Sequence, residues 1–227
     1  MLIHVRRAAL RRALVTAVGA VIALGAAAEG LRHFARGLVR ADFLSLLSLS
    51  YEGNLPTWAS AALLALAGGL LAVIAAGAVL DRGRWWLLSA GFFYISFDEV
   101  VGVHEAIDAM FENTGGLFYF GWIIPAAGLV ALLALFYVPF LRRLPASSRR
   151  RFVLAGALYV GGALLLELPL GLWTEHAGPD NWVYAAIDLV EESLEMIGVT
   201  VFILALVDHL VLPDGALTLT MRADARG

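Results

Sequence analysis

Long apolar runs separated by short polar links dominate the chain. Runs that can cross a bilayer lie near residues 13–35, 56–80, 85–108, 118–141, 152–173 and 183–212. Each is close to the roughly 20 apolar residues that a helix needs to span the hydrocarbon core. The pattern therefore predicts an all-α fold, a polytopic membrane helix bundle of about six transmembrane helices, formed as a single integral membrane domain over residues 1–227.

Composition supports a membrane protein and removes several kinds of chemistry. Hydrophobic residues make up 61% of the chain and charged residues only 15%, whereas soluble domains carry about 25% charged residues. The absence of cysteine excludes iron–sulfur clusters, thiolate zinc sites, disulfides and thiol nucleophiles. We expect membrane lipids as partners and no nucleic acid, while the oligomeric state is left open.

Arginine placement predicts the orientation of the helices. All 16 basic residues are arginine, and 13 of them fall on one side of a six-span topology. Only Arg32, Arg36 and Arg40 fall on the other side. The positive-inside rule then places both termini in the cytoplasm and the protein in a bacterial cytoplasmic (inner) membrane.

Two features near the N-terminus leave alternatives open. Ala26, Ala27 and Ala28 before Glu29 resemble a cleavage site, so the first apolar run is either a retained span or a signal peptide. The segment 38–50 is apolar but too short to span, and we expect it to lie along the outer interface or to re-enter the membrane.

Acidic side chains within the predicted spans are the main indication of function. They occur as Asp98-Glu99 with His104-Glu105, as Glu191-Glu192 with Glu195, and as Glu167. A charge at mid-membrane costs at least about 2.5–3.5 kcal/mol on insertion scales, so such residues usually face the bundle interior. In a continuous helix Asp98, Glu105 and Glu112 would share one face, with His104 at its border and Glu99 pointing away. We therefore predict that three helices turn their acidic faces toward one another.

Packed carboxylates repel one another unless protons or a cation neutralise them. A carboxylate-rich, histidine-poor set suits a divalent metal ion such as calcium, manganese or iron, with zinc less favoured. The predicted metal ligands are His104, Glu105, Glu167, Glu192 and Glu195, with Asp98 and Glu99 as supporting groups or a catalytic base. The alternatives are a proton or cation pathway, and carboxylates that only fix helix packing through hydroxyl partners such as Ser96, Thr57 or Tyr184.

Further candidates are Glu52, Asn54, Asp188, Glu191, and the i,i+4 pair Glu29 and His33. Asn54 with Pro56 also forms an ordinary turn and helix start, and Glu29 could instead pair with Arg32 or Arg36. His104-Glu105 resembles the start of a zinc-protease motif, but its second histidine is missing, so that class is excluded.

Three motifs together resemble an uncharacterised family of bacterial multipass membrane proteins. They are Glu52–Trp58 with the pattern E-x-N-L-P-T, Ser96–Glu105 with S-x-D-E-x4-H-E, and Glu191–Gly198 with E-E-x-L-E-M-x-G. The resemblance covers most of the chain but implies no reaction. A comparison with membrane hydrolases of the alkaline ceramidase type is weaker, because their set of histidines is lacking.

Three functional hypotheses follow. The first is a metal-dependent membrane protein, with a pocket in the outer half of the bundle, acting as an enzyme on a lipid-like substrate that enters sideways. The second is a proton- or cation-coupled transport component that uses the same carboxylates as a relay. The third is a structural subunit of a membrane complex. Small size and the lack of paired broken helices count against the second.

Overall fold

Helices account for nearly all of the computed structural model, which describes residues 4–111, 115–210 and 216–218. The long helices are α1 (Arg7–Phe34), α3 (Leu55–Gly77), α4 (Arg82–Val101), α6 (Ile123–Arg143), α7 (Ala146–Val160), α8 (Glu167–Ala177) and α9 (Trp182–Leu210). The short helices are α2 (Ala41–Ser45), α5 (Val103–Asp108), the 3-10 turn η1 (Gly116–Phe118) and the π-helical segment η2 (Gly161–Leu166). Strands β1 (His4–Arg6) and β2 (Ala216–Thr218) pair antiparallel.

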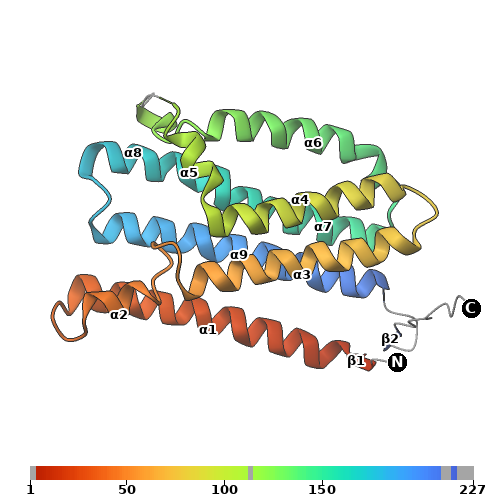
Figure 1. Cartoon of the computed structure of the whole chain (residues 1–227), viewed down its shortest axis with the longest axis horizontal. Coiled ribbons are helices and arrows are strands. Elements are labelled where there is room, and N and C mark those ends of the chain that lie inside the picture. The colour runs from red at the N-terminus through yellow and green to blue at the C-terminus, as the bar shows by residue number, and fades with distance from the viewer. Residues whose placement is uncertain (1–3, 112–114, 211–215, 219–227) are drawn as a thin grey trace, which may run out of the picture.

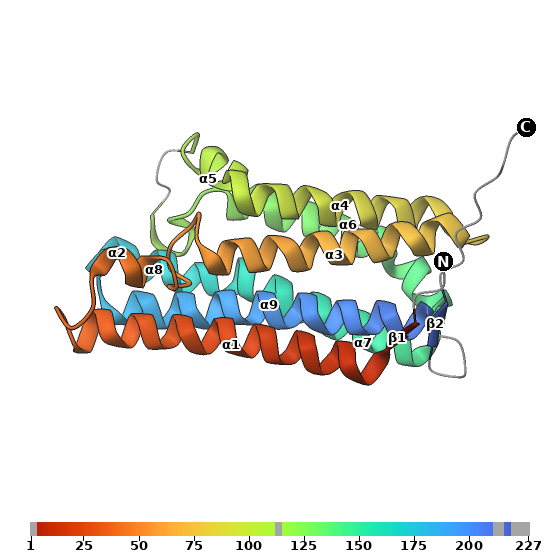
Figure 2. The same ribbon diagram turned by 60° about the horizontal axis from the view of Figure 1, so that its bottom comes forward.

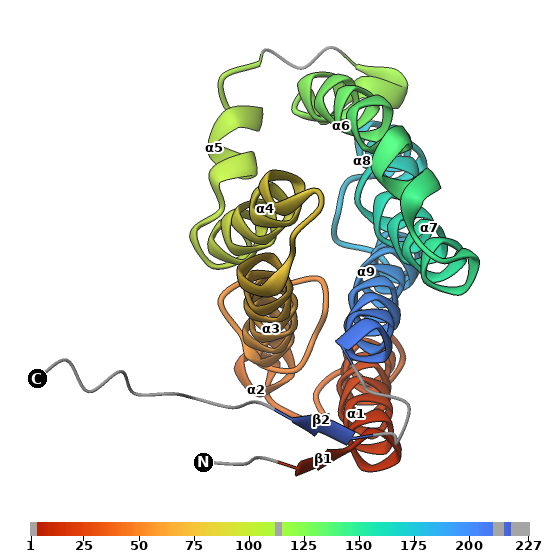
Figure 3. The same ribbon diagram turned by 90° about the vertical axis from the view of Figure 1, so that its right-hand side faces the viewer.

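The long helices run along one axis in alternating directions, so α1 begins and α9 ends at the same end of the bundle (Figure 1). We call this the terminal end, where β1 and β2 also lie (Figure 2); α2, α5 and the end of α8 lie at the opposite, distal end. Viewed along the axis, α2, α3, α4 and α5 form one row, while α1, α9, α7, α8 and α6 form the other (Figure 3). Helix α9 packs against α1, α3, α7 and α8, and is therefore the central helix.

The apolar core fills the terminal half of the bundle. Leu64 and Leu71 of α3, Phe140 of α6, and Ile203 and Leu206 of α9 are almost fully buried within it. Leu64 lies near the middle of α3, and the other four residues come from the parts of their helices that lie nearest the terminal end. The polar residues of the helices consequently concentrate in the distal half.

Four helical stretches are long and apolar enough to cross a membrane: Arg7–Phe34, Leu55–Gly77, Ile123–Arg143 and Ala146–Ala177. Helices α4 and α9, which carry Asp98, Glu99 and the acidic residues from Asp188 to Glu195, run alongside them in the same bundle (Figure 1). On α6, Leu129, Leu132 and Leu135 are more than half exposed. Such an outward apolar face suits contact with lipid chains rather than water.

The predicted span 85–108 is interrupted. Helix α4 ends at Val101 and α5 begins at Val103, because Gly102 caps α4 with a left-handed backbone (φ 67°). Glycine adopts that conformation without steric cost. The expected single face of Asp98, Glu105 and Glu112 is therefore wrong from Gly102 onward. Glu112, the last two residues of the predicted span 183–212, and the tail arginines Arg222 and Arg226 lie outside the described residues.

Ion pairs connect helices at the terminal end. Asp81, between α3 and α4, binds Arg84 and Arg143 at 2.6 Å each, and the hydrogen bond from Arg143 holds the pKa of Asp81 below its usual value. Asp208 of α9 likewise pairs with Arg7 of α1 and Arg151 of α7. These ion pairs tie the helix ends together at the terminal end.

Candidate functional site

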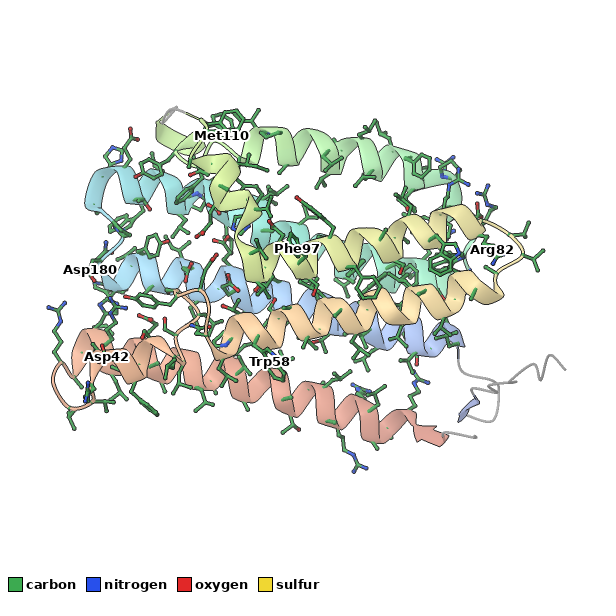
Figure 4. The ribbon with its side chains drawn as sticks, in the orientation of Figure 1. Asp42, Trp58, Arg82, Phe97, Met110 and Asp180 are labelled. Carbon is green, nitrogen blue, oxygen red and sulfur yellow. The ribbon has the colours of Figure 1, made fainter. Side chains whose placement is uncertain are left out.

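A pocket of about 350 Å³ lies in the distal half of the bundle. Its walls come from the α4–α5 break, the segments η2 and α8, helix α9, and the loop before α3. Ten acidic residues and one histidine line it: Glu52, Asp98, Glu99, His104, Glu105, Asp108, Glu167, Asp188, Glu191, Glu192 and Glu195. No arginine from the described part of the chain is among its lining residues. Figure 4 shows Asp180 at the distal end and Arg82 at the terminal end, with carboxylate oxygens gathered between α8, α9 and the α4–α5 break.

The structure brings most of the candidate residues into this one pocket. All five predicted metal ligands line it, together with Asp98 and Glu99 and the further candidates Glu52, Asp188 and Glu191. The prediction that Glu99 points away from the others is wrong, since it lies in the same wall as Asp98. Separate helices therefore contribute acids to a common space, as the cost of lipid exposure requires.

Asp98 fixes the position of His104. One Asp98 carboxylate oxygen lies 2.9 Å from His104 Nδ1, and the other accepts a hydrogen bond of 2.9 Å from the His104 backbone N–H. The ring lies beside Trp122, with centroids 5.3 Å apart, and Nε2 lies 3.9 Å from a Glu52 carboxylate oxygen. A carboxylate on Nδ1 orients the imidazole and leaves Nε2 for a ligand or a proton.

Gly102 permits both the helix break and a close approach of carboxylates. A Cβ atom there would lie 2.8 Å from Glu105 Oε2 and 3.6 Å from Glu52 Oε2. Burial and the neighbouring charge of Glu105 raise the pKa of Glu52, which lies in the loop before α3. The mouth of the pocket is therefore a place where negative charges already interact.

The central helix α9 meets η2 at the deepest acids. A Cβ atom on Gly162 would lie 2.7 Å from the Glu191 carbonyl oxygen and 2.9 Å from Glu195 Cγ. This close contact falls within the π-helical segment η2, and Glu167 follows it directly at the start of α8. Single π turns are frequent at functional sites, and here the turn positions Glu167 opposite α9.

Three buried carboxylate oxygens have no hydrogen-bond partner among the described residues: Glu167 Oε2, Asp188 Oδ2 and Glu191 Oε2. Glu191 is only 6% exposed, and all three residues line the acidic pocket. A buried polar group left unpaired costs about 1–3 kcal/mol, and a charged one costs more. These three oxygen atoms are therefore available to a further hydrogen-bond donor or to a cation.

The hydroxyl groups expected to satisfy the acids are largely engaged elsewhere. Ser96 donates to the Ala61 carbonyl oxygen at 2.8 Å, and Thr57 donates to Asn54 at 3.1 Å. Tyr184 does line the acidic pocket. Tyr159, which was not among the predicted residues, also lines it and interacts with Glu195. A tyrosine hydroxyl inside the apolar run 152–173 was the available signal, since such a group needs a polar partner.

Asn54, Glu29 and His33 lie outside the acidic pocket. Asn54 caps α3 by accepting from the Thr57 backbone N–H at 3.1 Å, and it donates to the Ser45 and Ser48 carbonyl oxygens. Its role is therefore the turn and helix start. Glu29 accepts a hydrogen bond from Ser48 and lies 3.2 Å from His33 Nε2, so it does not pair with Arg32 or Arg36.

The geometry is not a preformed metal centre. Among the described residues, no three histidine, aspartate or glutamate side chains are arranged to hold a metal ion. The lining supplies suitable oxygen donors, but their present positions do not bring them to one point. The expected metal site is thus unsupported as a fixed constellation, although the residues expected to form it share one pocket.

Comparison with known proteins assigns the chain to a family but does not identify a reaction. No curated protein and no solved structure matches the chain. The profile of a family described as a domain of unknown function, DUF8692, matches residues 12–210. This confirms the expectation of an uncharacterised family, and the chain belongs to the DUF8692 family.

Proposed function

We propose that the protein binds a divalent cation in the acidic pocket and acts in the membrane as a metal-dependent protein on a lipid-like substrate. The observation that carries the proposal is the concentration of acids in one pocket, together with three buried carboxylate oxygens that lack hydrogen-bond partners among the described residues. An acidic lining alone would also suit water, but buried unpaired oxygens favour a ligand that carries positive charge.

Electrostatics favours a cation over an empty acidic pocket. Unpaired buried charges cost several kcal/mol each, even after the protein relaxes, and neighbouring like charges add to that cost. The acids must therefore take up protons or a cation. His104 is the one basic side chain in the described lining, and a single imidazolium cannot balance so many carboxylates.

Oxygen donors favour calcium, manganese or iron over zinc. We infer that Glu105, Glu167, Glu192 and Glu195 supply carboxylate ligands and His104 supplies Nε2. Asp98 would hold the histidine in the ligating tautomer, as carboxylates behind metal-bound histidines do. Because no three donors are arranged around one point, binding requires the carboxylate side chains to rotate toward the ion.

Two alternatives are less well supported. A transport pathway would need a polar route to the terminal end, but Val199, Phe202, Ile203, Leu206 and Val207 of α9 are buried there in apolar packing. A purely structural role would leave the unpaired oxygens of Glu167, Asp188 and Glu191 unexplained.

Metal content of the purified protein tests the proposal. We expect about one or two divalent ions per chain by elemental analysis after purification in detergent, a range typical of carboxylate-rich sites. Glu195→Gln should lower that content, whereas Asp42→Asn should not, because Asp42 is exposed and pairs with Arg40 outside the pocket. Absence of metal from the wild-type protein, even after incubation with calcium, manganese or ferrous iron, would refute the proposal.

We further propose that the terminal end faces the cytoplasm, so that the acidic pocket opens toward the outer side. The support is the arginine distribution, in which 11 of the 14 arginines of the described residues belong to helix ends and links at that end, and the positive-inside rule. Reporters fused to the N-terminus and to the C-terminus should both give cytoplasmic signals, and a reporter inserted after Arg36 should give an external one. A cytoplasmic signal from the Arg36 insertion would contradict this orientation.

A further inference from the structure

Two of the three arginines of the distal end line one groove. A hollow of about 250 Å³ lies where α1 ends and the chain turns into α2, and Arg32, His33 and Arg36 line it. Leu31, Val39 and Leu44 provide apolar walls. Arg36 is exposed and has no ion pair among the described residues. The groove therefore offers guanidinium donors beside apolar surface.

The chain segment that forms this groove also exposes large apolar side chains, which we call the apolar rim. Phe34 and Leu38 are each 77% exposed, and Phe43 of α2 is 56% exposed. Large apolar side chains beside arginines are typical of a segment that lies at a membrane interface, with the rings and aliphatic groups in the acyl boundary. The spanning length and apolarity of α1 place its distal end at that depth.

We propose that this groove binds the phosphate group of a membrane lipid, with Arg32 and Arg36 donating hydrogen bonds to the phosphate oxygens. Guanidinium groups bind phosphate oxygens through paired N–H donors, and the apolar walls accept the first part of the acyl chains. A lipid is favoured over a free anion because the exposed apolar rim would gain nothing from a free anion.

Asp180 competes with the phosphate in this arrangement. Arg32 lies 3.5 Å from an Asp180 carboxylate oxygen and stacks over the Tyr51 ring at 4.6 Å. The Asp180 side chain is 84% exposed, so the pair is open to solvent and weak. A phosphate with higher charge can displace it, and removal of the Asp180 charge should strengthen lipid binding.

A second hollow links the groove to the acidic pocket. It shares Arg32, His33 and Asp180 with the groove, and Ser50, Tyr51 and Tyr184 with the acidic pocket. A lipid held by its phosphate thus has its polar part next to the acids. The substrate of the acidic pocket is then a phosphate-bearing lipid, and this assignment rests on the proposed function. The phosphate site in the groove does not depend on that function.

Binding of dioctanoyl phosphatidylglycerol to the purified full chain tests the inference. We expect Arg32→Gln and Arg36→Gln each to weaken binding about tenfold, the worth of one charge-assisted contact, and Asp180→Asn to strengthen it. Arg40→Gln is the matched control, because Arg40 pairs with Asp42 and does not line the groove; its affinity should equal that of the wild type. Circular dichroism of each variant checks that it has folded.

Two further ligands distinguish the contribution of the phosphate group to lipid affinity from that of the acyl chains. Dioctanoylglycerol, which lacks the phosphate, should bind weakly, and inorganic phosphate should not compete at millimolar concentration. Equal binding of dioctanoylglycerol, full competition by inorganic phosphate, or unchanged affinity in both arginine variants would overturn the inference. Metal content measured on the same samples keeps the two proposals distinguishable, since Arg36→Gln should retain metal and Glu195→Gln should retain lipid binding.

Discussion

Chelation of divalent cations is expected to lower the melting temperature of the purified protein at neutral pH. A cation that binds only the folded state at about 100 times its dissociation constant stabilises that state by roughly 2.7 kcal/mol. For a chain of this size, each kcal/mol changes the melting temperature by roughly 2–4 °C. Removal of the ion should therefore lower it by about 5–10 °C, because the carboxylates of the acidic pocket then repel one another.

Single ligand substitutions should reduce this sensitivity to chelation. Glu195→Gln and Glu105→Gln each remove a negative charge from the pocket lining. The bound cation then contributes less stability, so chelation lowers the melting temperature by a smaller amount. Asp42→Asn, which changes an exposed carboxylate outside the pocket, should respond to the chelator like the wild type. Thermal scans of the four proteins with and without chelator give the comparison.

Shared protons are the competing explanation. Acids that neutralise one another with protons would make the melting temperature depend on pH but not on chelator. Chelator-independent melting of the wild type at neutral pH would therefore exclude the cation. If pH also had no effect, and both glutamine variants melted like the wild type, the acids would have only a structural role.

The distribution of apolar residues was sufficient to predict the helical bundle. Runs of about 20 apolar residues bounded by arginines specify helices because backbone groups in a membrane must bond internally. The convergence of the acids on one pocket was also predictable for the same energetic reason: Glu167 and Glu195 are costly anywhere except the bundle interior. Both inferences required only the positions of apolar, basic and acidic residues along the chain.

Local backbone geometry was not predictable in the same way. Gly102 lies within an apolar run, and nothing in the run distinguishes a helix-breaking glycine from a packing one. Its left-handed backbone redirects α5, so the direction of Glu105 relative to Asp98 and Glu99 could not be derived from a continuous helix. The π turn at η2 likewise depends on tertiary packing against α9. The spacing of apolar residues along the sequence does not reveal such packing.

Partners of polar side chains were the second limit. Asn54 could have been a ligand or a helix cap, and only the contacts with Ser45, Ser48 and Thr57 identify the cap. Glu29 and His33 were correctly paired by spacing, but their helix turns them toward the neighbouring hollow and away from the acidic pocket. Spacing places two residues together, but it does not determine which cavity they face.

The adjacent glycines of η2 provide a sharp test of the link between helix packing and the pocket. Gly162→Ala is expected to destabilise the protein by about 1–3 kcal/mol, the usual cost of forcing an extra methyl group into a packed interface. The new Cβ atom would lie 2.7 Å from the Glu191 carbonyl oxygen and 2.9 Å from Glu195 Cγ. Backbone cannot yield as a flexible side chain does, so η2 and α9 must move apart.

Gly161→Ala is the matched control, because a Cβ atom there meets no atom of the described residues within 4 Å. Alanine is favoured over glycine in helical backbone by up to about 1 kcal/mol, so this variant should melt at or above the wild-type temperature. Gly162→Ala should melt about 2–12 °C lower for a chain of this size. It should also bind its cation more weakly, because the separation of η2 from α9 displaces Glu191 and Glu195. Equal melting of the two variants would show that α9 does not pack on Gly162 as described, and unchanged cation affinity in a destabilised Gly162→Ala would place the ion away from these two glutamates.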